Sequence, residues 1–176
     1  MKSIKLIVLS AFLTISAFCT VLYSSCSKTK DACAGVVCLN GGTCSNGTCI
    51  NCSTGYEGSR CDTLTRAKYS KSWAATDVPV GSSPAIAPYS AVIAASTTST
   101  AVTDVIIGNF SAGYFTHSVL ASVSGNTITI ASQQPDSDGY AVAGTGTYTA
   151  SKTITWTYTI TQVSSGLTIS YTGTWN

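Results

Sequence analysis

The sequence predicts an all-β protein with two parts, a small cysteine-rich module and a larger antiparallel β-meander. Six cysteines fall between positions 33 and 61. The stretch that follows them alternates apolar residues with threonine, which is the period of a half-buried strand, and shows no helical spacing. Both parts come after an N-terminal segment with the features of an export signal.

The N-terminal segment consists of two lysines in MKSIK, followed by an uncharged run from Leu6 to Ser25. These match the charged and apolar regions of a signal peptide. The run is also long enough to span a bilayer, so a retained N-terminal helix is the alternative. We expect a signal peptide at residues 1–25.

The end of this run resembles the lipobox of bacterial lipoproteins. In the stretch LYSSC, Ser24 and Ser25 precede Cys26, and Tyr23 stands where the family usually has leucine. The resemblance implies that Cys26 is lipidated and becomes the new N-terminus, with residues 26–32 as a tether. Such a lipid holds a protein to a membrane through buried methylenes, each contributing about 0.8 kcal/mol.

The six cysteines from Cys33 to Cys61 are predicted to form disulfides, because their number is even and an exported chain meets an oxidising environment. Zinc or redox chemistry is disfavoured, since only Cys49 and Cys52 form a close C-x2-C pair and the segment has no histidine. Asp31 alone offers too few oxygens for calcium. No metal or other cofactor is expected in the chain.

The cysteine-rich segment resembles the EGF-like family over residues 33–61. Five residues separate its second and third cysteines, an Asn-Gly-Gly-Thr turn precedes Cys44, and Gly-Tyr-Glu-Gly lies in the last loop. Two residues separate Cys49 from Cys52, where the family usually has one. The resemblance implies a small stapled module with the pairings Cys33–Cys44, Cys38–Cys49 and Cys52–Cys61.

Residues 62–71 are polar and basic and are interpreted as a linker. The remaining segment, residues 72–176, is long enough for one domain with its own core. Its clearest strand is TITWTYTITQ, in which Ile154, Trp156 and Tyr158 share one face and threonines share the other. Seven further strands are expected near residues 69–75, 88–96, 101–108, 114–123, 125–132, 140–149 and 166–175.

The short connections between these strands favour an up-and-down meander. Only Thr76–Pro88 is long enough for the return connection of a Greek key. We therefore favour a small lipocalin-like barrel, with a β-sandwich as the alternative.

Candidate catalytic and metal-binding residues are few. His117 is the only histidine, and we expect it to be a structural residue on a strand face with Phe115 and Val119. The stretch DSDG at 136–139 begins like a calcium loop but lacks the later acids, so it is interpreted as a turn. No glutamate follows Glu57, and no G-x-S-x-G elbow is present. We expect a protein that is not an enzyme.

The charge of the chain and its overall architecture restrict the kinds of partner that it can bind. Only 9% of the residues are charged, against about 25% in typical soluble proteins, and no basic run is dense enough for nucleic acid. A signal, a lipobox-like cysteine, an EGF-like module and a threonine-rich β domain together resemble small surface lipoproteins of Bacteroidota. The resemblance implies lipid anchoring in the outer membrane, facing the cell surface or, as the alternative, the periplasm.

Two functions follow from this architecture. We expect a membrane-anchored protein for adhesion to, or recognition of, an extracellular protein or glycan, with the EGF-like module as a spacer. The alternative is a carrier that holds a small apolar ligand inside the barrel. An apolar cavity would favour the carrier, and a filled core with exposed aromatic residues would favour the adhesin.

Overall fold

The computed structural model describes residues 31–81 and 84–176, and these form an all-β protein with two short 3₁₀ turns. The expected signal peptide and Cys26 lie outside the described residues. The chain divides into a unit that ends at Gly35 and a unit from Val36 to Asn176. In the first unit the Asp31 carboxylate accepts a hydrogen bond of 2.9 Å from the backbone N–H of Cys33. The described residues include no helix with the length and hydropathy of a membrane span.

The cysteine-rich segment contains two short antiparallel strand pairs. β1 (Thr43–Ser45) pairs with β2 (Thr48–Ile50), and β3 (Tyr56–Glu57) pairs with β4 (Thr63–Leu64). Such short strands bury little apolar surface, so they need another source of stability.

Disulfides supply that stability. They join Cys38 to Cys49 and Cys52 to Cys61, two of the pairings that the EGF-like resemblance implies. Cys33 and Cys44 are disulfide-bonded as well. These crosslinks are compatible with an EGF-like module, and they restrict the unfolded chain in place of a large core.

The segment interpreted as a linker, residues 62–71, has regular structure. It contains β4 and a 3₁₀ turn, η1 (Thr65–Lys68). Tyr69 is fully buried in the core of the β domain, and its hydroxyl donates a hydrogen bond of 3.1 Å to the carbonyl of Gly125. The core of that domain therefore begins before its first strand.

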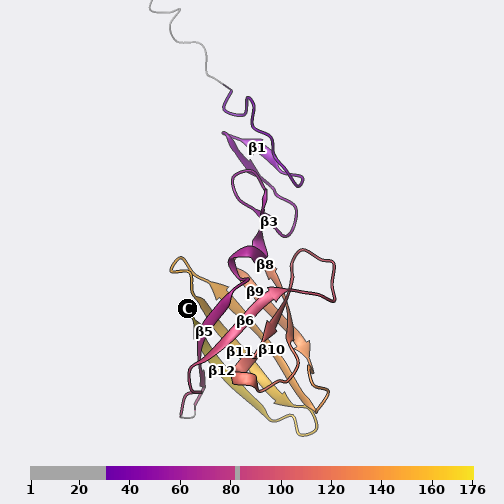
Figure 1. Ribbon diagram of the computed structural model, residues 1–176, viewed down its shortest axis with the longest axis vertical. Coiled ribbons are helices and arrows are strands. Elements are labelled where there is room, and N and C mark those ends of the chain that lie inside the picture. The colour runs from indigo at the N-terminus through magenta and orange to yellow at the C-terminus, as the bar shows by residue number, and fades with distance from the viewer. Residues whose placement is uncertain (1–30, 82–83) are drawn as a thin grey trace, which may run out of the picture. The chain divides into compact units, whose positions relative to one another are not determined.

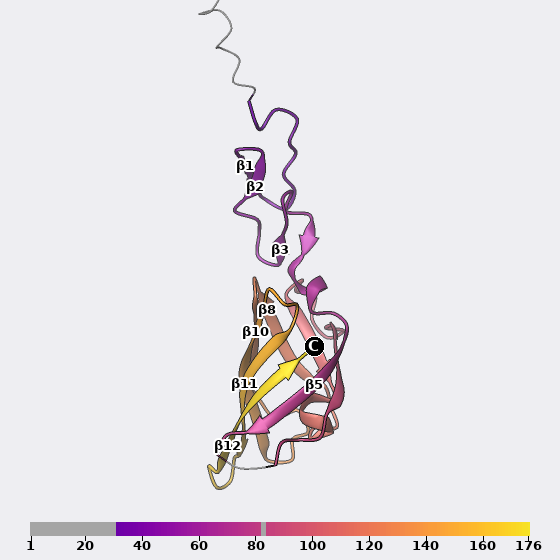
Figure 2. The ribbon, with the colours of Figure 1, turned by 90° about the vertical axis from the view of Figure 1, so that its left-hand side faces the viewer.

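Eight antiparallel strands close into a barrel in the order in which they occur along the chain (Figure 1). Each strand pairs with its neighbours in sequence, and the first and last strands lie side by side where the barrel closes (Figure 2). This confirms the up-and-down meander and excludes the β-sandwich. The strands are β5 (Ser72–Pro79), β6 (Tyr89–Ala95), β7 (Asp104–Gly108), β8 (Val119–Ser124), β9 (Thr127–Gln133), β10 (Tyr140–Tyr148), β11 (Ile154–Gln162) and β12 (Thr168–Trp175).

Two regions differ from the prediction. β5 continues to Pro79, so the connection to β6 is shorter than the expected stretch Thr76–Pro88. β8 begins at Val119 because the preceding residues form a 3₁₀ turn, η2 (Phe110–Gly113), and a loop. His117 lies in that loop, so the strand face predicted around it is wrong.

Aromatic side chains fill the middle of the barrel. β11 alternates buried and outward residues, with its threonines facing out, as the sequence predicts. All three tryptophans, Trp73, Trp156 and Trp175, are at most 2% exposed. Phe110 of η2 packs edge-on against Trp156, with ring centroids 5.7 Å apart. An eight-stranded barrel is just wide enough to be filled by side chains, and large rings fill this one.

The close contact between β10 and β11 depends on Gly144. A Cβ at this position would lie 2.7 Å from the carbonyl oxygen of Thr157 and 2.7 Å from the Cα of Tyr158, and backbone atoms cannot move aside. We expect Gly144→Ala to lower the free energy of unfolding by about 1–3 kcal/mol, measured by urea denaturation. Gly108→Ala is the matched control, because its nearest neighbour would be the Val92 oxygen at 3.9 Å. Equal stability of the two variants would contradict the prediction.

Candidate binding site at one mouth of the barrel

A buried carboxylate lies in the core beneath one end of the barrel. Asp77 of β5 is fully buried, and its Oδ2 accepts hydrogen bonds from the hydroxyls of Tyr89 and Tyr158, the latter at 2.7 Å. The indole Nε1 of Trp175 donates to Oδ1 at 3.1 Å. Gly173 leaves the space that the carboxylate occupies, since a Cβ there would overlap Oδ1. Three neutral donors therefore surround one acid.

The two tyrosines of this network remain neutral donors. Burial, together with the charge of Asp77 and its hydrogen bonds, raises the pKa of Tyr89 and Tyr158 above the usual range. The Tyr158 hydroxyl also lies 3.0 Å from the Ser111 hydroxyl. The network thus connects β5 and β11 to η2.

The barrel is hollow at the end where β11 stops and β10 and β12 begin. The hollow has a volume of about 180 Å³. Its floor includes Tyr171, which stacks on Tyr158 with ring centroids 4.9 Å apart and planes at 9°. At its rim, Leu167 is 64% exposed and Ile169 is 44% exposed. The lining residues of this hollow, here called the mouth, are Tyr114, Tyr140, Ile160, Gln162, Leu167, Ile169 and Tyr171.

Two tyrosines form a corner at the rim of the mouth. Tyr114, from the loop after η2, meets Tyr140 edge-on, with centroids 5.7 Å apart and planes at 82°. Tyr114 also packs against the buried Phe115, 5.0 Å away. Burial, followed by the influence of Tyr140 and Asp138, raises the pKa of the Tyr114 phenol. The corner therefore consists of two aromatic rings that lie nearly at right angles.

Two acids, Asp138 and Asp77, act on residues that line the mouth. Asp138 stands on the turn before β10 and accepts a hydrogen bond of 3.0 Å from the backbone N–H of Tyr140. Beneath the floor, the charge of Asp77 adds to burial in raising the pKa of Tyr171. Lys152 is the only lysine or arginine from Trp73 onwards, and it lies at the opposite ends of β10 and β11.

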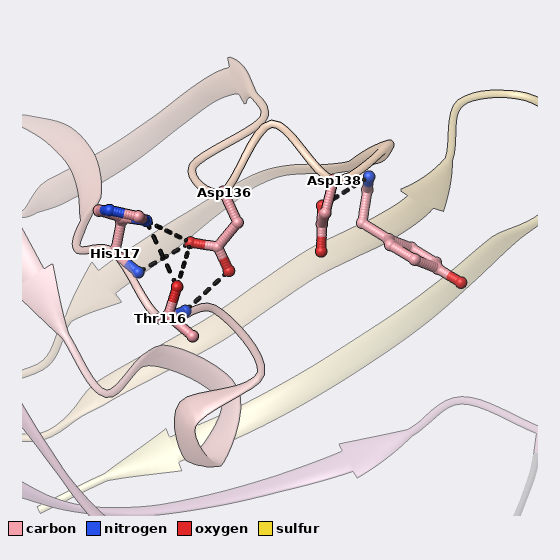
Figure 3. A network of polar contacts seen from close by, with 5 residues as sticks. Thr116, His117, Asp136 and Asp138 are labelled. Carbon is pink, nitrogen blue, oxygen red and sulfur yellow. Dashed lines mark hydrogen bonds and ion pairs between the residues drawn. The ribbon is translucent and has the colours of Figure 1, made fainter.

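A polar cluster joins two loops at the same end of the barrel (Figure 3). Oδ1 of Asp136 accepts hydrogen bonds from the backbone N–H of His117 at 2.8 Å and the hydroxyl of Thr116 at 2.9 Å. Oδ2 accepts one from the backbone N–H of Thr116 at 2.7 Å. The ring Nδ1 of His117 is 2.8 Å from Oδ1, and the imidazole side chain is 74% exposed. Asp136 therefore clips the loop before β8 to the turn predicted at 136–139.

This cluster is built to hold loops. In the described part of the chain, the hydrogen bonds of the His117 ring run through Nδ1 to Thr116 and Asp136. A nucleophilic site would place a hydroxyl or thiol within reach of the free ring nitrogen. Across residues 31–81 and 84–176, no three His, Cys, Asp or Glu side chains are grouped as metal ligands.

The hydrogen bonds of Asp136 predict that the stability of the protein decreases at low pH. Backbone N–H donation from Thr116, and further bonds from His117, hold the pKa of Asp136 well below its usual range. A lowered folded-state pKa contributes stability above the unfolded-state pKa of about 3.9, and this stability is lost as the pH falls through the folded value. We expect the urea concentration at the unfolding midpoint to decrease once the pH is below about 4. The decrease is expected to be smaller in Asp136→Asn. Parallel acid profiles for the two proteins would contradict this assignment.

Two larger hollows lie on the outside of the barrel. One, of about 290 Å³, is lined by residues of the β6–β7 loop and of β7, β8 and β9, and its one titratable residue, Asp104, already accepts a hydrogen bond of 2.6 Å from Ser99. The other, of about 280 Å³, is lined by small and aliphatic residues around Ala141 and Thr159. Neither contains an aromatic ring, so the mouth is the stronger candidate site.

Asp77 was assigned no role by the sequence analysis. The signal was present in WAATDV, where Trp73, Ala75 and Asp77 alternate and so point to the same face. An acid in an inward register indicates a polar network in the core, because buried charges need partners.

The fold and the mouth define a small β-barrel consistent with a carrier or a binding protein. Comparison of the chain with protein-family models, with curated proteins and with solved structures finds no match. The functional argument therefore rests on the residues of the mouth.

Proposed function

We propose that this protein is a non-enzymatic recognition protein, anchored in the outer membrane by a lipid on Cys26 and displayed at the cell surface. In this proposal the EGF-like module is a stapled spacer, and the barrel offers its mouth to an extracellular protein or glycan. The lipobox-like sequence supports the anchor, and the disulfides support an oxidising compartment.

The distribution of the aromatic rings carries this proposal. Rings fill the middle of the barrel, while Tyr114 at the mouth is 44% exposed. The mouth, at about 180 Å³, is smaller than the roughly 300–1,000 Å³ of pockets that enclose a whole drug-sized ligand. It therefore suits a single ring or branched group that a larger partner presents. Tyrosine is favoured at such contacts because its ring is apolar and its hydroxyl can form hydrogen bonds.

Surface display is tested on intact cells that produce the native protein. An antibody against the barrel is expected to label unbroken cells, and protease treatment of those cells is expected to remove the label. A periplasmic marker that stays intact is the control for leakage. Labelling that appears only after lysis would rule out surface recognition.

The role of the mouth is tested with a matched pair of leucines. Glycan and protein arrays are probed with the full-length protein, with Leu167→Asp at the mouth and with Leu120→Asp on the outer wall, where Leu120 is 48% exposed. We expect Leu167→Asp to lose the captured partner and Leu120→Asp to keep it. Retention by both variants would exclude the mouth as the binding surface.

The carrier remains the second candidate because the buried side chains of Ile160 and Tyr171 line the mouth, and barrel carriers hold their ligands on the inner face of the barrel. Mass spectrometry of the protein purified from its own membrane separates the two functions. One small apolar molecule per chain, reduced in Ile160→Asp, would favour the carrier. Recovery of the protein free of such a molecule would favour recognition.

A further inference from the structure

The chemistry of the mouth is that of a site for a positive charge. Tyr114 and Tyr140 meet edge-on at 82°, and both rings line the hollow together with the ring of Tyr171. The face of an aromatic ring carries the negative part of its quadrupole and attracts cations placed over it. None of the lining residues is a lysine, an arginine or a histidine.

The carboxylates around the mouth act in the same direction. Asp138 accepts a hydrogen bond from the backbone N–H of Tyr140, and Asp77 accepts one from the hydroxyl of Tyr158, whose ring stacks on Tyr171. His117, on the loop before β8, has its ring Nδ1 2.8 Å from Oδ1 of Asp136. A cation in the mouth would therefore meet attraction from the rings and from the acids without displacing a positive side chain.

The apolar part of the lining restricts the kind of cation. Ile160, Leu167 and Ile169 offer no side-chain acceptor, so the acceptors of the lining are the Gln162 carboxamide and the hydroxyls of its three tyrosines. An ammonium with free N–H groups would lose hydrogen bonds to water there, whereas a methylated ammonium has none to lose. The lining thus favours a charged group whose surface is apolar.

We propose that the mouth binds a trimethylammonium group that has no anionic group beside it, as in choline or a trimethylated lysine. This inference rests on the mouth being the binding site under the proposed function, and it assigns the class of ligand. Asp138, the acid beside Tyr140, disfavours phosphocholine because it would repel the phosphate.

The test is calorimetry on the full-length protein, purified from membranes in a maltoside detergent that carries no choline. Choline is compared with dimethylbutanol, its uncharged carbon isostere, and with phosphocholine and trimethyllysine amide. We expect choline and trimethyllysine amide to bind roughly tenfold more tightly than the isostere. Raising the salt concentration is expected to weaken only the charged ligands.

Paired variants separate the ring from the hydroxyl. Tyr114→Phe and Tyr140→Phe keep the ring face and are expected to keep the affinity for choline within about twofold, whereas Tyr114→Leu and Tyr140→Leu are expected to lower it roughly tenfold. Asp138→Asn is expected to weaken choline but not the isostere.

Three outcomes would overturn the inference. Equal affinity for choline and the isostere would make the mouth an apolar pocket, and recognition by the mouth would stand. Tighter binding of phosphocholine than of choline would contradict the acidic rim. Absence of choline binding, in a protein whose array partner is lost in Leu167→Asp, would reject the cation while keeping the proposed function.

Discussion

Replacing Asp77 with alanine is expected to lower the free energy of unfolding by at least about 3 kcal/mol. The substitution removes the acceptor of the partly buried Tyr89 hydroxyl and of the buried indole N–H of Trp175, and it leaves the buried Tyr158 hydroxyl with Ser111 alone. Each orphaned buried donor costs about 1–3 kcal/mol. Urea unfolding, followed by the fluorescence of the three buried tryptophans, measures the loss.

Two control variants give this prediction its meaning. Asp77→Asn keeps one acceptor oxygen but turns an amide N–H₂ toward one of the donors, so its loss is expected to be smaller than that of Asp77→Ala. Thr76→Ala, at the exposed neighbouring position, is expected to change stability by less than about 0.5 kcal/mol. If Asp77→Ala were as stable as Thr76→Ala, the carboxylate would not hold the core together.

Truncating Phe110 to alanine is expected to cost about 3–5 kcal/mol. Phe110 is 1% exposed, and its ring lies 4.7 Å from that of Tyr158 and 5.8 Å from that of Trp175. Its neighbours Ser111 and Ala112 have φ values of 52° and 57°, a conformation that costs roughly 1–2 kcal/mol for each residue other than glycine. The ring anchors a strained turn, so its loss removes core packing and releases the turn.

The anchoring role has a separate measurement. Hydrogen exchange is expected to show faster exchange from η2 through Tyr114 in Phe110→Ala than in wild type under native conditions. Phe110→Leu keeps an apolar side chain in the cavity and is expected to lose less than half as much stability. A Phe110→Ala protein within about 1 kcal/mol of wild type would show that the turn is held by other contacts.

The eight-stranded architecture could be predicted because its signals are local. β11 alternates in its own sequence, and short connections limit the topology to neighbouring strands. An open meander leaves an unpaired edge on its first and last strands. When both strands are long enough to pair with each other, the sheet is expected to close into a barrel.

The candidate site could not be predicted in the same way, because its parts come together only in three dimensions. Trp175 reaches Asp77 across 98 positions of sequence, and Thr116 reaches Asp136 across 20. The positive φ of Ser111 has no local signal, since residues other than glycine rarely adopt it. The sequence around His117 predicts a strand, whereas hydrogen bonds to Asp136 hold His117 in a loop.

Closure of the barrel by β5 and β12 also sets the order in which the protein assembles. Seven of the strand pairings are between consecutive segments, whereas the β12–β5 pairing joins the two ends of the domain. Loop-closure entropy delays such distant contacts relative to local hairpins. Until β12 is present, β5 has an unpaired edge that can add to another chain. The last strand to form is therefore the one that protects a newly made molecule from aggregating.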